Sequence, residues 1–219
     1  FVIWNFRTNE VARESNQTLI SLGESNDFDK TLTSYTTLNY QKSIGDHYLN
    51  LLTGHSIETF ESENFSASIK DLFSTATSVI NAGTLEPNVG GNFTEWALIS
   101  YFGRLNYDYQ DKYLFEANFR YDGSSRFAEG NRWGAFPSFS LGWRISEEQF
   151  FPELPFLSDF KIRGSWGQLG NQNIGNYPYQ AVYSLDPKYS FNGQLQTGAA
   201  QTVLANDNIK WETTTSTNI

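Results

Sequence analysis

The sequence predicts an all-β fold and, within that class, a segment of an antiparallel transmembrane β-barrel. Apolar and polar residues alternate along several stretches, which is typical of strands with one face in an apolar environment. These stretches exceed the ~5–6 residues usual in soluble sheets and match the ~9–11 residues that cross a membrane. Tight turns also alternate with long polar connections, as in outer-membrane barrels. The pattern accounts for about seven to nine strands of a larger barrel, open as a fragment.

The best-defined strand is expected at 113–122. Its odd-numbered positions carry apolar side chains such as Phe115 and Phe119, whereas its even-numbered positions include Glu116 and Arg120. Because successive side chains of a strand point to opposite faces, we expect the first set to face lipid and the second to face the barrel interior. The full set of expected strands is 32–44, 47–57, 94–109, 113–122, 135–146, 158–168 and a last strand through Trp211.

Two kinds of connection join these strands. The turns at 45–46 and 110–112 are tight, and we place the second at the periplasmic end because it is the shortest connection beside well-formed strands. We expect a short helix within 67–82 and a local hairpin near 178–195. The long polar connections then lie on the outward side, at 58–93, 123–134 and 169–208.

Composition excludes several functions. The chain has 15 basic and 24 acidic residues, a net charge of −9, which argues against nucleic-acid binding because phosphates need clustered Lys and Arg. The absence of cysteine excludes disulfides, thiolate catalysis and Cys-type zinc sites. His47 and His55 lie more than ~25 Å apart along an extended strand and cannot share a metal ion. No catalytic grouping of side chains is present, so we expect no enzyme activity and no cofactor.

The polar connections hold the residues that we expect to contact a substrate. They combine amides and aromatic rings, which suit the hydroxyls and faces of sugars, with two arginines. These residues are Arg126, Arg132, Trp133, Asn171, Asn173, Asn176, Tyr177 and Tyr179. The alternative for the stretch 171–179 is a loop held in shape by its own Asn and Gly turns. We expect the two arginines to pair with Asp122 and Glu129, which leaves their role toward a ligand open.

Four ordered runs resemble one known family. They are SYFGRLNYDYQDKYLFEANFRYDGSSRF (100–127), NRWGAFPSFSLGWRISEEQFF (131–151), LSDFKIRGSWGQLGNQNIGNYPY (157–179) and NDNIKWETTTSTNI (206–219). In this order they resemble the barrel of a SusC/RagA-type TonB-linked outer-membrane protein. The resemblance is co-linear over 94–219 and weaker over 32–57.

The resemblance implies that residues 1–219 are part of a TonB-dependent receptor β-barrel domain whose plug domain is absent. It implies a place in the lipid of the outer membrane of a Gram-negative, Bacteroidota-like cell. It also implies import of oligosaccharides or peptides, a SusD-like surface lipoprotein as partner, and energy from TonB through the missing N-terminal part. The alternative is a soluble secreted β-sandwich that binds carbohydrate. Only the barrel exposes one continuous apolar face, formed by Phe115, Phe119, Phe139, Trp143 and Phe160.

Overall fold

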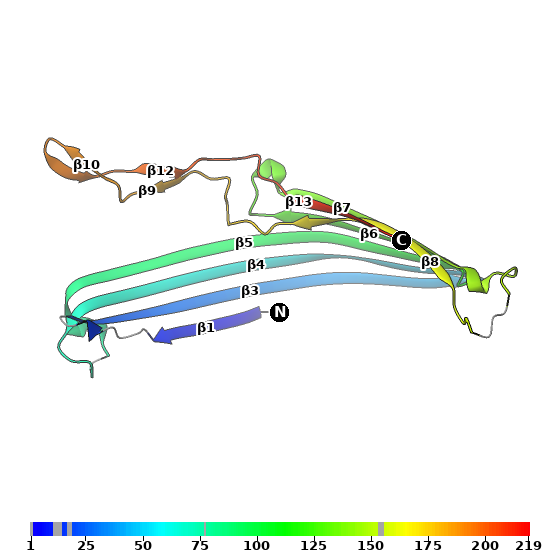
Figure 1. Cartoon of the computed structure of the whole chain (residues 1–219), viewed down its shortest axis with the longest axis horizontal. Helices are drawn as coiled ribbons and strands as arrows, with labels where there is room; N and C mark the ends of the chain where they lie inside the picture. Colours follow the sequence, from blue (N-terminus) through cyan, green and yellow to red (C-terminus); the bar gives the residue numbers. More distant parts are fainter. Residues whose placement is uncertain (1, 11–14, 17–18, 77, 153–155) are drawn as a thin grey trace. The chain divides into compact units, whose positions relative to one another are not determined.

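The computed structural model describes residues 2–10, 15–16, 19–76, 78–152 and 156–219, and most of them lie in strands. The main sheet has the order β1-β3-β4-β5-β6-β7-β8-β13 (Figure 1). The short strand β2 pairs with β3. Two small ladders, β10–β11 and β12–β9, lie within the connection between β8 and β13. From β3 to β8, each strand therefore pairs with the strands that precede and follow it in the main sheet.

The elements have the following bounds. The strands of the main sheet are β1 (Val2–Glu10), β2 (Ser15–Asn16), β3 (Leu19–Ile44), β4 (His47–Leu72), β5 (Gly83–Tyr109), β6 (Tyr113–Ser124), β7 (Trp133–Arg144), β8 (Lys161–Asn171) and β13 (Glu212–Asn218). The small ladders comprise β9 (Val182–Ser184), β10 (Lys188–Phe191), β11 (Gln194–Thr197) and β12 (Ala200–Val203). Three short 3-10 turns are η1 (Ile80–Ala82), η2 (Glu129–Asn131) and η3 (Ile145–Glu147).

Much of the predicted strand order is confirmed. Strands β5, β6 and β7 contain or closely match the stretches expected at 94–109, 113–122 and 135–146. Strand β13 begins directly after Trp211 and pairs antiparallel with β8, so it runs in the expected direction. The local hairpin expected near 178–195 is present as the two small ladders, which are nested one inside the other.

The connection predicted at 58–93 is wrong. Strand β4 continues to Leu72 and β5 begins at Gly83, so only 73–82 connect them. The helix expected within 67–82 is also wrong, because the described residues of this stretch end β4 and form the short turn η1, with no α-helix among them. Strand β3 likewise starts well before the expected boundary at residue 32. The apolar residues of these extensions are few and, in β4, fall on both faces, as Phe60 and Phe65 do, so their alternation is too weak to be recognised from hydropathy.

The chain divides into two compact units. The first comprises Phe1–Thr33 and Glu58–Trp96 and has a small core of Leu22, Ile69 and Leu72, with Ile20 and Ile80 packed against it. An ion pair between Lys30 and Glu61 joins neighbouring strands of this unit at 3.3 Å. The second unit comprises Ser34–Ile57 and Ala97–Ile219 and contains strands β6, β7, β8 and β13.

The strands of the second unit have one apolar and one polar face. Register places Phe115 beside Tyr107 on β5 and beside Leu141 on β7, so the apolar side chains of adjacent strands share one face. On this apolar face Phe119 and Phe139 are about half exposed, at 50% and 47%. Trp143 and Phe160 are also exposed, whereas Phe115 is partly buried.

Large exposed aromatic side chains on a continuous sheet face are the arrangement that a lipid-facing surface requires. In a β-sandwich the same face would pack against a second sheet, and among the described residues no second sheet covers it. The structure therefore favours the barrel over the sandwich. No helix among the described residues is long and apolar enough to cross a membrane.

Candidate functional site

The end of β6 leads into a compact loop built around a buried phenylalanine. Phe127 is fully buried, at 0% exposure, although it lies in the polar segment between β6 and β7. The Ser124 hydroxyl, also buried, accepts a hydrogen bond from the backbone N–H of Arg126 at 3.2 Å. The Ser125 hydroxyl accepts another from the N–H of Ala97 at 2.9 Å, which ties the loop to β5. The loop is therefore a fixed element of the structure.

Trp211, just before β13, packs onto this loop from a distant part of the chain. Its ring lies 5.2 Å from the ring of Phe127 and 5.2 Å from that of Phe136 on β7. Its indole N–H donates a hydrogen bond to the backbone carbonyl of Arg132 at 2.8 Å. The indole ring is therefore packed against other rings and its N–H is hydrogen-bonded, as is usual for a partly buried tryptophan.

Two further contacts join the same loop to the long connection after β8. The Arg126 guanidinium donates to the backbone carbonyls of Gln172 and Ile174, at 3.3 and 3.1 Å. The Asn131 amide donates to the carbonyl of Asp207 at 2.6 Å. We call residues 125–132 and 172–211 together the loop cluster. The shorter segment thus contacts the longer one near both of its ends.

The expected pairing of the two arginines is not what the structure describes. Asp122 is buried and its ion pair, at 3.1 Å, is with Arg120 two residues earlier on the same face of β6. Arg132 donates instead to the backbone carbonyl of Phe127 at 3.4 Å. Arg126 and Arg132 thus both donate to backbone carbonyls of the loops, which holds these loops together.

Of the predicted substrate residues in the 171–179 stretch, Asn173, Asn176, Tyr177 and Tyr179 lie in the loop cluster, and Asn171 is the last residue of β8 beside it. The Asn171 side chain accepts from the N–H of Asn173 and donates to Glu212, which is an Asn-type turn of the kind expected if the loop shapes itself. Tyr177 has φ 50°, and its ring meets that of Tyr179 edge to face at 6.3 Å. Asn173 is exposed, whereas Asn176 is partly buried.

Trp133 lies apart from these residues. Its ring stacks on Tyr121 at 4.8 Å and on Tyr101 at 6.2 Å, side chains of the apolar face. A group of aromatic rings at the end of lipid-facing strands is typical of a membrane interface. The sequence did not separate Trp133 from the other candidates because its neighbours in the chain are loop residues.

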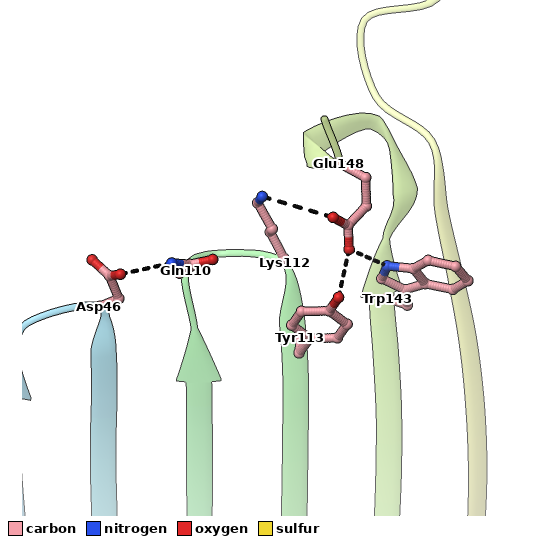
Figure 2. Close-up of polar contacts among 6 residues, drawn as sticks. All are labelled: Asp46, Gln110, Lys112, Tyr113, Trp143 and Glu148. Atoms are coloured by element: carbon pink, nitrogen blue, oxygen red, sulfur yellow. Dashed lines mark hydrogen bonds and ion pairs between the residues drawn. The ribbon is translucent and has the colours of Figure 1, made fainter. Parts of the chain in front are cut away.

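The opposite end of the same strands carries a second aromatic and polar group (Figure 2). The Glu148 carboxylate, after η3, accepts hydrogen bonds from the Tyr113 hydroxyl at 2.6 Å and the Trp143 indole at 3.0 Å. The Lys112 ammonium lies 3.8 Å away. In the neighbouring turns the Gln110 amide donates to Asp46 at 2.7 Å.

These contacts change the acidity of Glu148. The pKa of the Glu148 carboxyl lies below its ordinary value. The hydrogen bond from Tyr113 is the largest cause, followed by the hydrogen bond from Trp143; the positive charge of Lys112 also lowers the pKa, whereas burial raises it. Tyr109 stacks on Tyr113 at 6.2 Å, so tyrosine rings gather around the turn 110–112 at this end of the strands. No group of three or more potential metal ligands is found among the described residues.

An antiparallel sheet with one exposed apolar face, aromatic clusters at both ends and tight turns opposite extended loops defines an integral outer-membrane β-barrel protein. Residues 2–219 match the family model described as TonB dependent receptor-like, beta-barrel, and the chain belongs to this family. The SusC/RagA-type resemblance inferred from the sequence is confirmed by the relatives described next.

Three similar proteins support this family assignment. The chain is 45% identical over 57% of its length to the TonB-dependent receptor SusC of Bacteroides thetaiotaomicron. It is 33% identical over 98% of its length to the TonB-dependent receptor P39 of Formosa agariphila. In structure it resembles a chain of the RagAB peptide importer in its 'closed-closed' state, with a TM-score of 0.85, 26% identity and 99% of this chain covered.

The chain spans only 13%, 21% and 24% of the length of these three proteins. The relatives are TonB-dependent receptors and not enzymes. The family places the chain in the outer membrane, so the apolar face lies against lipid and the polar face lines the barrel interior.

Proposed function

We propose that the chain forms part of an importer that takes up glycans or peptides across the outer membrane with a SusD-like surface lipoprotein. The energy would come from TonB through a part of the protein outside residues 1–219. Similarity to a chain of the RagAB peptide importer and to the TonB-dependent receptor SusC supports this proposal. The RagAB chain shares the fold over 99% of this chain.

The observation that carries the proposal is the anchored loop cluster. Phe127, Trp211 and Arg126 fix two loops to each other at the end of the strands opposite the tight turns. A rigid surface loses little conformational entropy on binding, which favours the capture of a dilute ligand. We infer that this end faces the cell exterior and meets the substrate first.

Within the loop cluster, Tyr177 and Tyr179 are the side chains we assign to substrate contact, together with Asn173. The strained φ of Tyr177 is a feature that a folded loop retains where the side-chain position matters. Asn171 and Asn176 complete the polar surface. Arg126 and Arg132 hold the loops, and Trp133 marks the membrane boundary, so we assign these three to positioning.

Binding to the complete gene product in detergent tests this assignment. Tyr177→Ala and Tyr179→Ala are each expected to weaken binding of the transported glycan or peptide by at least about fivefold, the level of an energetically important contact. Tyr189→Ala is the matched control, because Tyr189 is an exposed tyrosine on β10 outside these contacts. Equal affinities for all three variants and the unchanged protein would contradict the assignment.

Co-purification tests the partner. A lipoprotein of the SusD type should remain with the affinity-tagged gene product after mild detergent extraction of outer membranes. Its absence from the extract under conditions that preserve RagAB would argue against this part of the proposal.

A further inference from the structure

A groove opens on the apolar face near the ends of the strands that carry the tight turns. Residues of two neighbouring rows, set by the register of β5 to β8, line it. The row farther from the turns is Tyr107, Phe115, Leu141 and Gly164. The row nearer the turns is Tyr109, Tyr113, Trp143 and Ile162. The groove measures about 360 Å³, and its lining side chains are all apolar or aromatic.

The groove is open because β8 has no side chain at residue 164. A Cβ atom added at Gly164 would meet only the backbone carbonyl oxygen of Asn218, at 4.0 Å. The neighbouring side chains of Leu141 and Ile162 are both exposed. The groove is therefore accessible from the lipid and has room for an apolar chain.

Hydrogen bonds fix the aromatic walls of the groove. On the β5 side, the Tyr107 hydroxyl and His47 Nδ1 are hydrogen-bonded at 2.7 Å. At the turn end, Tyr113 and Trp143 both donate to the Glu148 carboxylate, which holds the two rings in place (Figure 2). Because walls held in this way do not collapse inward, an unfilled groove would forfeit dispersion contacts along its lining. An apolar chain that fills the groove recovers these contacts.

The turn end of the groove offers both signs of charge to a headgroup. The Lys112 ammonium lies 3.8 Å from the Glu148 carboxylate, which is beyond hydrogen-bonding distance. In the part of the chain that the structure describes, no acceptor is hydrogen-bonded to this ammonium. Its three N–H groups are thus available to a phosphate. Asp108 and Asp111 lie beside each other at the same turn, so a headgroup of net negative charge is disfavoured there.

We propose that this groove binds one acyl chain of a zwitterionic phospholipid in the membrane leaflet beside the tight turns. The headgroup phosphate accepts hydrogen bonds from Lys112, and the headgroup ammonium lies beside Glu148. The acyl chain runs from the strand ends toward the middle of the membrane, which is the direction that a lipid has in a bilayer. The site lies on the outside of the barrel, so it is independent of what the importer carries.

Packing and charge each contribute modestly to this site. Lipid tails are as apolar as the side chains, so the bound chain gains packing contacts and not hydrophobic free energy. A lysine near the membrane surface adds about a fivefold preference for a lipid that carries a phosphate. The expected result is a lipid that is retained selectively but still exchanges with the bilayer.

Native mass spectrometry of the complete gene product tests the proposal. The protein, freed of lipid in a neutral detergent, is titrated with dioleoyl phosphatidylethanolamine, dioleoyl phosphatidylglycerol or dioleoylglycerol, which differ only in the headgroup. The first phosphatidylethanolamine should bind about fivefold more tightly than dioleoylglycerol, and also more tightly than phosphatidylglycerol. Equal affinity for phosphatidylethanolamine and dioleoylglycerol would overturn the site. An affinity for phosphatidylglycerol that is at least as high would overturn the zwitterionic headgroup.

Gly164→Leu tests the chain site, because the new side chain would fill the groove without a clash. It should weaken the binding of phosphatidylethanolamine and of dioleoylglycerol by at least about fivefold each, since several methylene groups lose their packing contacts. Gly103→Leu is the matched control on the same face, opposite Phe119 and outside the groove. A Cβ atom there would meet only the Leu52 carbonyl oxygen, at 3.6 Å. Equal binding by the two variants would overturn the groove as the chain site.

Lys112→Gln tests the headgroup separately. It should weaken the binding of phosphatidylethanolamine about fivefold and leave dioleoylglycerol within about twofold, because only the phosphate contact is lost. Lys161→Gln is the control, because Lys161 is an exposed lysine at the same end of the strands on the polar face, opposite Arg144. Resistance to SDS at room temperature shows that each variant is folded. Lys112→Gln alone decides if Gly164→Leu does not fold, and equal affinities of Lys112→Gln and Lys161→Gln for phosphatidylethanolamine would overturn the proposal.

Discussion

Removing the indole of Trp211 should release the long connection after β8 from the rest of the loop cluster. Trp211→Ala deletes the ring contacts with Phe127 and Phe136 and the hydrogen bond to the Arg132 carbonyl. Tryptophan-to-alanine changes in cores cost ~3–5 kcal/mol, and we take ~3 kcal/mol because Trp211 is only partly buried. Trp211→Phe keeps a ring but loses the hydrogen bond, at a cost of ~1 kcal/mol.

These energies convert into loop opening. Since ~1.4 kcal/mol corresponds to a factor of ten, the open population of 172–208 should rise more than ~100-fold in Trp211→Ala and ~5-fold in Trp211→Phe. Hydrogen exchange of the complete gene product in detergent measures this directly through the backbone amides of 172–208. The amide of Asn206, which donates to the Tyr179 carbonyl at 3.1 Å, is one reporter.

Trp133→Ala is the matched control, because Trp133 stacks on the apolar face and not in the loop cluster. It should leave exchange in 172–208 unchanged. The reasoning is refuted if Trp211→Ala exchanges no faster than Trp133→Ala. An equal effect of Trp211→Phe and Trp211→Ala would show that the hydrogen bond, and not ring packing, holds the loop.

Three further predictions concern the strands and the turns. Ala117→Arg, on the lipid-facing side of β6, should destabilise the folded barrel by ~2–4 kcal/mol in urea titrations in lipid vesicles. Asn118→Arg, on the interior face, should cost much less, and equal costs would contradict this assignment of the two faces of β6. Because the pKa of Glu148 is lowered in the folded protein, its carboxylate contributes to stability above the ordinary pKa of 4.5, and this contribution is lost as pH falls through the lowered pKa. The NMR signal of the Trp143 indole N–H, which donates to Glu148, should therefore shift on acidification. Glu148→Gln should abolish that shift. Asp111 has φ 55° in the turn after β5, so Asp111→Gly should stabilise the β5–β6 hairpin by ~0.4–1 kcal/mol, and a loss of stability would contradict this account.

The strands in the membrane were predictable because lipid imposes a simple pattern on them. Along β6 every second side chain must be apolar, and this alternation defined both its bounds and its two faces. The first half of β5 precedes Leu98, where its pairing with β6 begins, and its apolar residues Leu85, Val89 and Phe93 are separated by Pro87 and Gly91. Because proline and glycine are unfavourable within strands, the sequence placed the start of this strand too late, although its backbone already pairs there.

The loop cluster was predictable only in part. The same two-residue period that defines β6 also sets Arg120 and Asp122 on one face, which is the signal for their ion pair that we overlooked. By contrast, nothing local in the sequence links Phe127 to Trp211, because their contact depends on how two distant loops fold.

The sidedness of the loops in living cells tests the central claim most directly. Single cysteines at Gly130 and Asn173, in the two parts of the loop cluster, should react with a membrane-impermeant maleimide on intact cells. Gly130 has no neighbouring atoms that would obstruct a side chain, and Asn173 is exposed. A cysteine at Asp111, in the tight turn at the other end of the strands, should react only after the outer membrane is permeabilised. Reaction at Asp111 but not at Gly130 or Asn173 on intact cells would contradict the account, because the loop cluster would then face the periplasm.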